Sequence, residues 1–501
     1  MRFFKKTSVK DQMNSKTRIT SYDRNENIDC IKELLHHTND LSVRNLLFKD
    51  KNISIIYINT IVNGEILETK IIQQIINNPS DSLSNTVSIK EIRQSNSVDQ
   101  LVTSLVQGNV IIFVEGETNS YILDSASFEK RSIEEPISEQ VIRGPHDGFV
   151  ENLGVNINLI RNRIKSRNLV VKYQTLGRES ATRLALIYIS NIANDDIIKE
   201  VEHRLSFINV DLVQAPGQLE EYIENSSFSP FPQILNTERP DRVASNLMDG
   251  RVVLLTDGSP SALIVPITFF AFYQTPDDYN SRWFVGSFFR LIRLVSFFIA
   301  ISLPAFYISI VSFHYEIIPI DLIFNVKGSL EYVPVPPLIE AMAMQTTLEL
   351  LREASIRLPS PIAQTIGVVG GLVIGTAVVE ANLVSNTMVV IIALTAIASF
   401  VVPISEMGTS IRLLGFPLML AASLLGLVGI VFVLIIILIH LCKLESFGSP
   451  YFAPFAPFRK KDFKDTIIRV PMWSMTKRPS TPHPQNENRE NNSRGWKHDE
   501  E

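Results

Sequence analysis

The sequence predicts an α+β membrane protein, in which two tandem α/β units form an N-terminal domain and an α-helical transmembrane domain follows. Two observations carry this prediction. The first half of the chain contains an ungapped internal repeat, and the second half contains apolar segments of about 20 residues or more, enough for a helix to cross a hydrocarbon core of about 30 Å. Hydrophobic residues make up 45% of the 501 positions, but they are concentrated in a central apolar part between a polar N-terminal part and a polar C-terminal tail.

The repeat aligns residues 99–123, DQLVTSLVQGNVIIFVEGETNSYIL, with residues 241–265, DRVASNLMDGRVVLLTDGSPSALIV. In both copies a helical segment leads through a glycine into a strand, a glycine turn and a second strand. Gly108 matches Gly250 and Gly116 matches Gly258. A search for internal periods therefore predicts two α/β units of one topology. The alternative is that strand-turn-strand patterns recur by chance.

Composition and motifs exclude several classes of function. The net charge is −5 and no stripe of basic and aromatic residues is present, so nucleic acid is not an expected partner. Cys30 and Cys442 cannot build a disulfide framework or a metal cage, and the histidines lack zinc spacing. The glycine turns lack the phosphate-loop pattern. We therefore expect neither an enzyme nor a cofactor or metal site.

These patterns predict the following domain boundaries. The soluble part should begin with a disordered tail and continue through two units that a helical linker joins. The N-terminus lacks an apolar signal region, so this part should stay in the cytoplasm. The expected ranges are 1–27 for the tail, 28–130 for the first α/β unit, 131–167 for the linker, 168–281 for the second unit, 282–445 for the transmembrane domain and 446–501 for a cytoplasmic tail that is disordered after about 471.

The transmembrane domain should contain about four spans plus an amphipathic or re-entrant helix. We expect the spans at about 290–313, 362–381, 383–402 and 411–441, the last being one long tilted helix or two short pieces. The amphipathic helix should lie within residues 333–359, in a stretch that is too charged for an ordinary span. Basic residues before the first span and after the last place both ends of the domain in the cytoplasm, so the number of crossings should be even.

Three glycines follow one side of the second span. Gly367, Gly371 and Gly375 recur at every fourth residue, and missing side chains there let another helix approach closely. Ordinary helix packing is one interpretation, and a tightly packed helix in an oligomeric pore is the other.

The opposite side of the same helix is the candidate gate. At about 100° per residue this side carries a stripe that is polar at both ends and apolar in the middle, as in a pore that closes by dewetting. A lipid-facing stripe is the alternative. The residues are Thr365, Val369, Val373, Thr376 and Glu380.

Acidic residues of the amphipathic helix are candidates for cation selectivity. Glu340, Glu349 and Glu353 would form rings of carboxylates in an oligomer and would concentrate cations. Alternatively, Glu349 and Glu353 pair with Arg352 or Arg357 on a solvated face.

Five segments resemble the A subunit of GerA-type spore germinant receptors: RGPHDGF, TERPDRVASNLMDGRVVLLTDGSPSALIVP, FYQTPDDYNSRWFVGSFFRLIR, ELLREASIRLP and the stretch 361–403. The resemblance covers about residues 28–458. One departure is Gln345, which stands where the family commonly has an acidic residue. The resemblance implies the inner membrane of bacterial endospores, a transporter-like B subunit that binds the nutrient, a lipoprotein C subunit, and an A subunit that forms homo-oligomers and conducts monovalent cations among membrane lipids.

Three classes of function follow. A ligand-gated cation channel subunit agrees with polar residues beside the spans. A secondary transporter should show its repeat within the membrane part, whereas this repeat lies in the soluble part. A signalling scaffold, whose spans would serve only as a membrane anchor, would not need a glycine-lined hairpin. A related family member, the sporulation stage V A-operon F protein, shares the membrane part and remains an alternative for ion or dipicolinate release.

Overall fold

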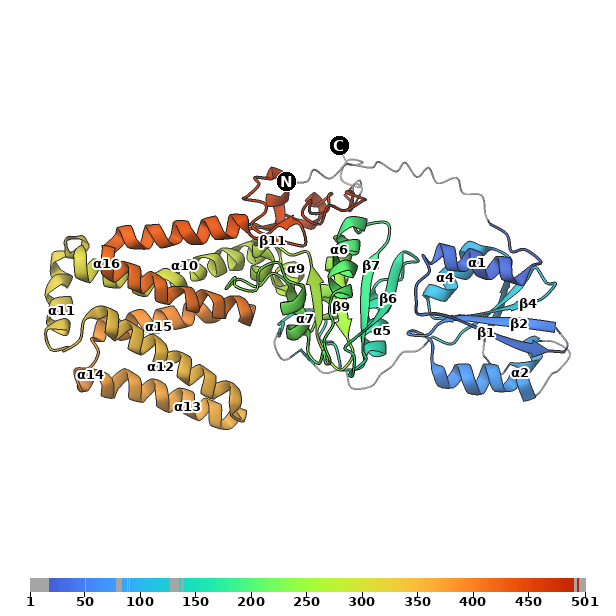
Figure 1. The fold of residues 1–501 in the computed structure, drawn as a ribbon, viewed down its shortest axis with the longest axis horizontal. Helices are drawn as coiled ribbons and strands as arrows, with labels where there is room; N and C mark the ends of the chain where they lie inside the picture. The colour runs from blue at the N-terminus through green and yellow to red at the C-terminus, as the bar shows by residue number, and fades with distance from the viewer. Residues whose placement is uncertain are drawn as a thin grey trace. The chain divides into compact units, whose positions relative to one another are not determined.

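The computed structural model describes residues 18–49, 51–77, 83–87, 89, 91–126, 135, 136, 139–490, 493 and 494 (Figure 1). The first α/β unit is a five-stranded antiparallel sheet with the strand order β1-β2-β4-β5-β3. Its elements are α1 (Arg24–Leu34), β1 (Leu41–Phe48), β2 (Lys51–Ile58), η1 (Ile66–Ile72), α2 (Gln73–Asn77), α3 (Leu83–Thr86), β3 (Ile92–Ser95), α4 (Val98–Val106), β4 (Val110–Val114) and β5 (Ser120–Leu123).

Helices cover both faces of this sheet. On one face α1 and α4 pack through Ile31 and Leu101 onto the strands, and on the other face η1 and α2 pack through Ile71 and Ile75. In Figure 1 α1 and α4 lie on one side of the strands and α2 on the other. Because both faces are covered, every residue of β4, VIIFV, is buried.

The second α/β unit repeats the strand arrangement of the first. Its sheet has the strand order β6-β7-β9-β10-β8, which is the same order with the numbers advanced by five. The two units therefore share one topology, and chance recurrence of a local pattern does not explain this. The elements are α5 (Leu153–Arg163), β6 (Leu169–Leu176), β7 (Thr182–Ile189), α6 (Asp195–Ser206), α7 (Pro216–Ile223), β8 (Leu235–Thr237), α8 (Pro240–Met248), β9 (Val252–Thr256) and β10 (Ala262–Val265).

The matched glycines have matched backbone conformations. The φ angle is +92° at Gly108 and +93° at Gly250, where the chain leaves a helix. It is +79° at Gly116 and +82° at Gly258, in the hairpin turns. Residues with a side chain rarely adopt these angles, so the repeat retains glycine at the points where the backbone requires it.

The helical region follows two short elements, η2 (Phe269–Tyr273) and α9 (Pro276–Asn280). Among the described residues, three helices are long and apolar enough to cross a membrane: Trp283–Phe313, Ile362–Glu380 and Ser405–Lys443. With these segments the predicted fold class of two α/β units followed by a helical membrane region is confirmed. The helices are α10 (Trp283–Phe313), α11 (Ile320–Glu331), α12 (Pro337–Arg357), α13 (Ser360–Leu372), η4 (Val373–Ala377), α14 (Val378–Glu380), α15 (Asn386–Phe400) and α16 (Ser405–Lys443).

Helix α16 folds back on itself at Gly426, whose φ of 63° and ψ of −141° are not helical. Near its start Ser410 donates to the carbonyl of Pro230, and near its end His440 Nε2 lies 2.8 Å from Ser229 Oγ. Both ends therefore lie beside the same loop of the second α/β unit, and the two segments run in opposite directions. The last apolar run is thus two pieces rather than one long tilted span.

Helix α12 forms where the sequence predicts an amphipathic or re-entrant helix beside the bilayer, and it runs along α15. Near its start Glu340 accepts hydrogen bonds from Ser385, just before α15. Two-thirds of the way along, Arg352 Nη2 lies 3.2 Å from Ser399 Oγ, near the end of α15. The two helices are therefore parallel, and the charged side of α12 pairs with neighbours.

The C-terminal segment, residues 446–490, packs against the second α/β unit. Tyr451 is fully buried and its hydroxyl donates to the carbonyl of Pro232 at 2.6 Å. Thr481 is buried, and the amide of Gln485 donates to the carbonyl of Ile192 at 2.8 Å. The sequence predicts disorder after about residue 471. In the structure, residues 472–490 instead contact the α/β unit through backbone hydrogen bonds.

Replacing Gly108 by alanine should destabilise the protein by about 1–3 kcal/mol, because the new Cβ meets a φ of +92° and lies 3.1 Å from the carbonyl oxygen of Ile61. The thermal unfolding midpoint of the purified protein should fall. Gly64→Ala is the matched control, since nothing lies within 4 Å of its added Cβ. Equal midpoints for the two variants would contradict the requirement for glycine.

Candidate functional site: buried charges at the base of α10

The base of α10 is held by buried charges from three parts of the chain. Asp278 of α9 accepts from Arg290 Nε at 2.8 Å and from Arg293 Nη1 at 2.9 Å. Asp465 of the C-terminal segment accepts from Arg290 Nη1 at 2.8 Å. Asp278 is 1% exposed and Arg290 is 3% exposed. This group, which we call the charged junction, joins the α/β unit, the first long helix and the C-terminal segment.

Two further residues complete the charged junction. The hydroxyl of Tyr279 donates to Asp465 Oδ2 at 2.7 Å, and its ring lies 5.2 Å from the guanidinium of Arg290. Arg469 Nη1 donates to the carbonyl of Asp278 at 2.5 Å. Close approach here depends on Gly286, since a Cβ at that position would lie 2.7 Å from the same carbonyl. The pairs of Asp278 with Arg290 and Arg293, and of Asp465 with Arg290, offset part of the cost of burying these charges, whereas Arg469 donates to backbone carbonyls.

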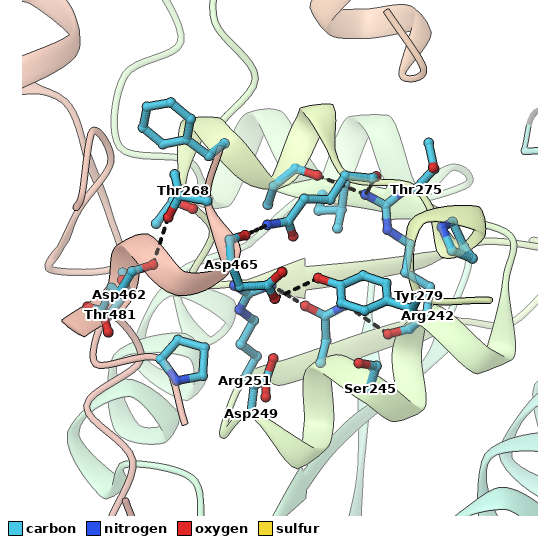
Figure 2. A pocket seen from close by; sticks show the side chains of 18 of the residues that line it. Arg242, Ser245, Asp249, Arg251, Thr268, Thr275, Tyr279, Asp462, Asp465 and Thr481 are labelled. Atoms are coloured by element: carbon cyan, nitrogen blue, oxygen red, sulfur yellow. Dashed lines mark hydrogen bonds between the residues drawn. The ribbon is translucent and has the colours of Figure 1, made fainter. Parts of the chain in front are cut away.

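A cavity of about 230 Å³ lies next to the charged junction (Figure 2). Residues of α8 and α9 form one wall and the C-terminal segment forms the other. Figure 2 shows Asp465 and Tyr279 joined across it, with Arg251 and Asp249 below them. The labelled lining residues are Arg242, Ser245, Asp249, Arg251, Thr268, Thr275, Tyr279, Asp462, Asp465 and Thr481.

Burial controls the protonation chemistry of this cavity. It raises the pKa of the Asp249 carboxyl and lowers the pKa of the Arg251 guanidinium, because desolvation disfavours both charged forms. Burial also raises the pKa of the Tyr279 phenol, and the charge of Asp465 adds to this effect. The phenol therefore remains a hydrogen-bond donor. Within the described part of the chain, no three His, Cys, Asp or Glu side chains gather as metal ligands.

The candidate gate residues lie on α13, η4 and α14. Thr365, Thr376 and Glu380 are exposed within this single chain, while the side chains of Val369 and Val373 lie outside the described set. Residues 373–377 form a π-helical turn. Because such a turn holds more than 3.6 residues, the stripe expected at about 100° per residue is not continuous through it. Thr376 and Glu380 are therefore rotated relative to Thr365.

The three glutamates lie in three different environments. Glu340 is 1% exposed and lies at the start of α15, where Ser385 binds it, so it does not share a surface with the other two. Glu349 pairs with Arg412 of α16 at 2.8 Å. Glu353 pairs with Arg357 on an exposed surface. The pair of Glu353 with Arg357 is the alternative given by the sequence. Glu349 also pairs with an arginine, but its partner is Arg412 instead of Arg352 or Arg357.

Among the described residues, none packs closely against the glycine stripe. A Cβ added at Gly367, Gly371 or Gly375 would have no heavy atom within 4 Å. Helix α13 instead approaches α12 at Gly370, where an added Cβ would lie 2.9 Å from Leu351. The stripe therefore remains available to another molecule.

Sequence reasoning did not find the charged junction. Arg290 and Arg293 are among the basic residues that orient the first span, and charges at a bilayer edge also need partners. The available signal was their three-residue spacing, which puts both on one helical face. Their partner Asp278 precedes them by a short loop, but Asp465 is separated from Arg290 by most of the helical region.

Taken together, the apolar helices and the charged junction define a membrane protein whose first long helix is ion-paired to α9 and to the C-terminal segment. The chain belongs to the Bacillus/Clostridium GerA spore germination protein family, whose sequence model matches residues 29–481. The family resemblance seen in the sequence is thereby confirmed.

Relatives match over most of the chain. Spore germination protein A1 of Bacillus subtilis (strain 168) is 42% identical over 78% of this chain and 82% of its own length. Membrane protein YfkQ of the same organism is 38% identical over 94% of both chains. A crystal structure of the N-terminal domain of the A subunit of the Bacillus megaterium spore germinant receptor GerK3 is 27% identical, covering 50% of this chain and 98% of that domain, with a TM-score of 0.39.

Replacing Asp278 by asparagine should destabilise the protein by about 3–5 kcal/mol, because Arg290 and Arg293 would lose the carboxylate that they share in a buried site. Thermal unfolding of the purified protein in detergent measures this. The control is Glu117→Gln, which breaks an exposed pair with Lys51 and should change stability by at most about 1 kcal/mol. Similar losses in both variants would show that the buried pairing is unimportant.

Proposed function

We propose that this chain is the A subunit of a spore germinant receptor and that it forms an oligomeric, nutrient-gated cation channel that triggers endospore germination. Its partners would be further copies of itself, a transporter-like B subunit that binds the nutrient, and a lipoprotein C subunit. It would reside in the inner membrane, with both termini on the cytoplasmic side, the spore core.

The observation that carries this proposal is the glycine stripe of α13 and η4. Among the described residues, no heavy atom lies within 4 Å of a Cβ added at any of its three glycines. Small residues permit backbone contact between helices in a bilayer. A ring of subunits joined along this stripe would surround a pathway for ions.

We propose six crossings, whereas the sequence predicts about four. These are α10, α12, the continuous α13–α14 segment, α15, and the two segments of α16. Successive helices connect alternately at the two ends of the bundle. Gly426 lies against Phe313 at one end, and His440 lies against Ser229 at the other. Six is even, so the proposed topology still leaves both termini on one side.

The direct test is conductance of the purified protein in planar bilayers, with and without the B subunit. The proposal requires cation-selective currents that the nutrient modulates when the B subunit is present. A substrate-coupled flux without channel events would favour a transporter, and the absence of any current under both conditions would favour a scaffold.

Gly371→Leu should prevent oligomer assembly, because a bulky side chain would separate helices that otherwise touch through their backbones. Oligomer mass in detergent is the measurement. Gly328→Leu in α11 is the matched control, since it too has nothing within 4 Å of the added Cβ. An unchanged oligomer mass for Gly371→Leu would count against the proposed interface.

Charge neutralisation at Glu353 should reduce the ratio of cation to anion permeability more than neutralisation at Glu349. Glu353 is 60% exposed and its pair with Arg357 is weak, so its charge acts on the solution. The charge of Glu349 is compensated by Arg412, whose side chain is 11% exposed. The reversal potential in a salt gradient distinguishes the variants E353Q and E349Q. No shift with either variant would remove both residues from the pathway.

Val369→Thr and Val373→Thr should produce a leaky channel, because a hydroxyl of equal volume hydrates an apolar constriction. The π turn that begins at Val373 supports this position for a gate, since such turns are frequent at functional sites. Nutrient-independent ion loss is the readout, and Val368→Thr is the neighbouring control. Lower abundance without leakage would identify a lipid-facing position instead.

A further inference from the structure

The C-terminal segment lies beside the first turns of α10. The hydroxyl of Ser287 donates to the carbonyl of Arg469 at 2.9 Å, and Arg290 Nη1 donates to the carbonyl of Asp465 at 2.8 Å. Phe452 is linked to Phe297 of α10 through Phe269, with ring centroids 5.6 and 5.7 Å apart. Residues 452–469 are therefore held at the level of the first four turns of this helix.

That level corresponds to the lipid headgroups. Helix α10 has 31 residues and is about 46 Å long, whereas the hydrocarbon core is about 30 Å thick. Its first turns contain the exposed Trp283 and Phe284 and end with Arg290 and Arg293. Aromatic and basic residues are typical of the membrane interface. The hydrocarbon core therefore begins beyond Arg293, and the C-terminal segment lies at its edge.

The segment presents apolar and basic side chains together, and we call this set the interfacial strip. Its most exposed apolar member is Phe458, at 72%, and Trp473 is 48% exposed. The strip comprises Phe455, Phe458, Lys460, Lys461, Lys464, Ile468, Met472 and Trp473, all of them exposed. Large apolar side chains exposed in such a group indicate a contact with another surface.

The positive charge of the interfacial strip is not balanced by its own acids. Asp462 accepts from the amide of Ser480 at 3.2 Å and from its hydroxyl, and Asp465 belongs to the charged junction. Lys464 donates to the carbonyl of Ser474 at 3.3 Å, and among the described residues no carboxylate forms an ion pair with it. A cationic strip with Phe and Trp at the depth of the headgroups fits an anionic lipid surface better than an apolar protein face.

We propose that the interfacial strip binds the headgroups of anionic phospholipids. Lys460, Lys461 and Lys464 contact the phosphates, and Phe458 and Trp473 enter the boundary between headgroups and acyl chains. The bound lipid holds the C-terminal segment on the membrane and thereby supports the charged junction through Asp465. This inference does not depend on channel activity.

The first test is stabilisation of the full-length protein in detergent by added phosphatidylglycerol, with phosphatidylcholine as the control lipid. The thermal midpoint should rise with phosphatidylglycerol, and the apparent affinity should fall about fivefold for each lysine replaced in K460Q/K461Q/K464Q. The variant K460R/K461R/K464R should retain binding. K477Q, in the same segment but paired with Glu487, should behave as the unmodified protein. Equal responses to the two lipids would overturn the proposal.

The second test places Trp473 in the bilayer. The protein contains three tryptophans, so W283F/W496F leaves Trp473 as the only fluorophore of this kind. In liposomes containing phosphatidylglycerol, brominated lipids should quench its fluorescence and aqueous acrylamide should not. Quenching by acrylamide alone would overturn the proposal. If Trp473 were protected from both quenchers only in the presence of the B and C subunits, the interfacial strip would contact a protein partner. That result would also overturn the lipid proposal.

Discussion

Asp278 is the point on which the arrangement of the second α/β unit and the helical bundle depends. It caps its own short helix and neutralises two arginines of α10, and a backbone carbonyl of the same residue receives Arg469. A buried carboxylate with two guanidinium partners is stable only in one geometry, because any displacement leaves a charge unpaired in a poorly solvated place. The start of α10 is therefore fixed relative to the α/β unit.

The same constraint explains why the C-terminal segment is ordered although its sequence is polar and rich in proline. Asp465 supplies the second carboxylate of the charged junction, and Tyr451 is buried against the loop before β8. The segment is thus part of the structural core at the membrane edge.

The helical bundle shows how pairing changes the meaning of a charged residue. In the sequence, Glu349 and Glu353 lie on one polar side of the predicted helix, and Glu340 lies nearer its start. In the structure one is buried at the start of α15, one pairs with Arg412, and one lies exposed beside Arg357. The helices packed around α12 therefore decide which of the three carboxylates reaches water.

The sequence by itself determined the class of the protein, because both decisive signals are local. The match of Gly108 with Gly250 predicted two units of one topology, and runs of apolar residues predicted the membrane helices. Only the tertiary structure decided that α16 bends at Gly426, that α12 joins the bundle, and that Asp465 pairs with Arg290. These features depend on contacts between residues far apart in the chain, and no period or composition records such a contact.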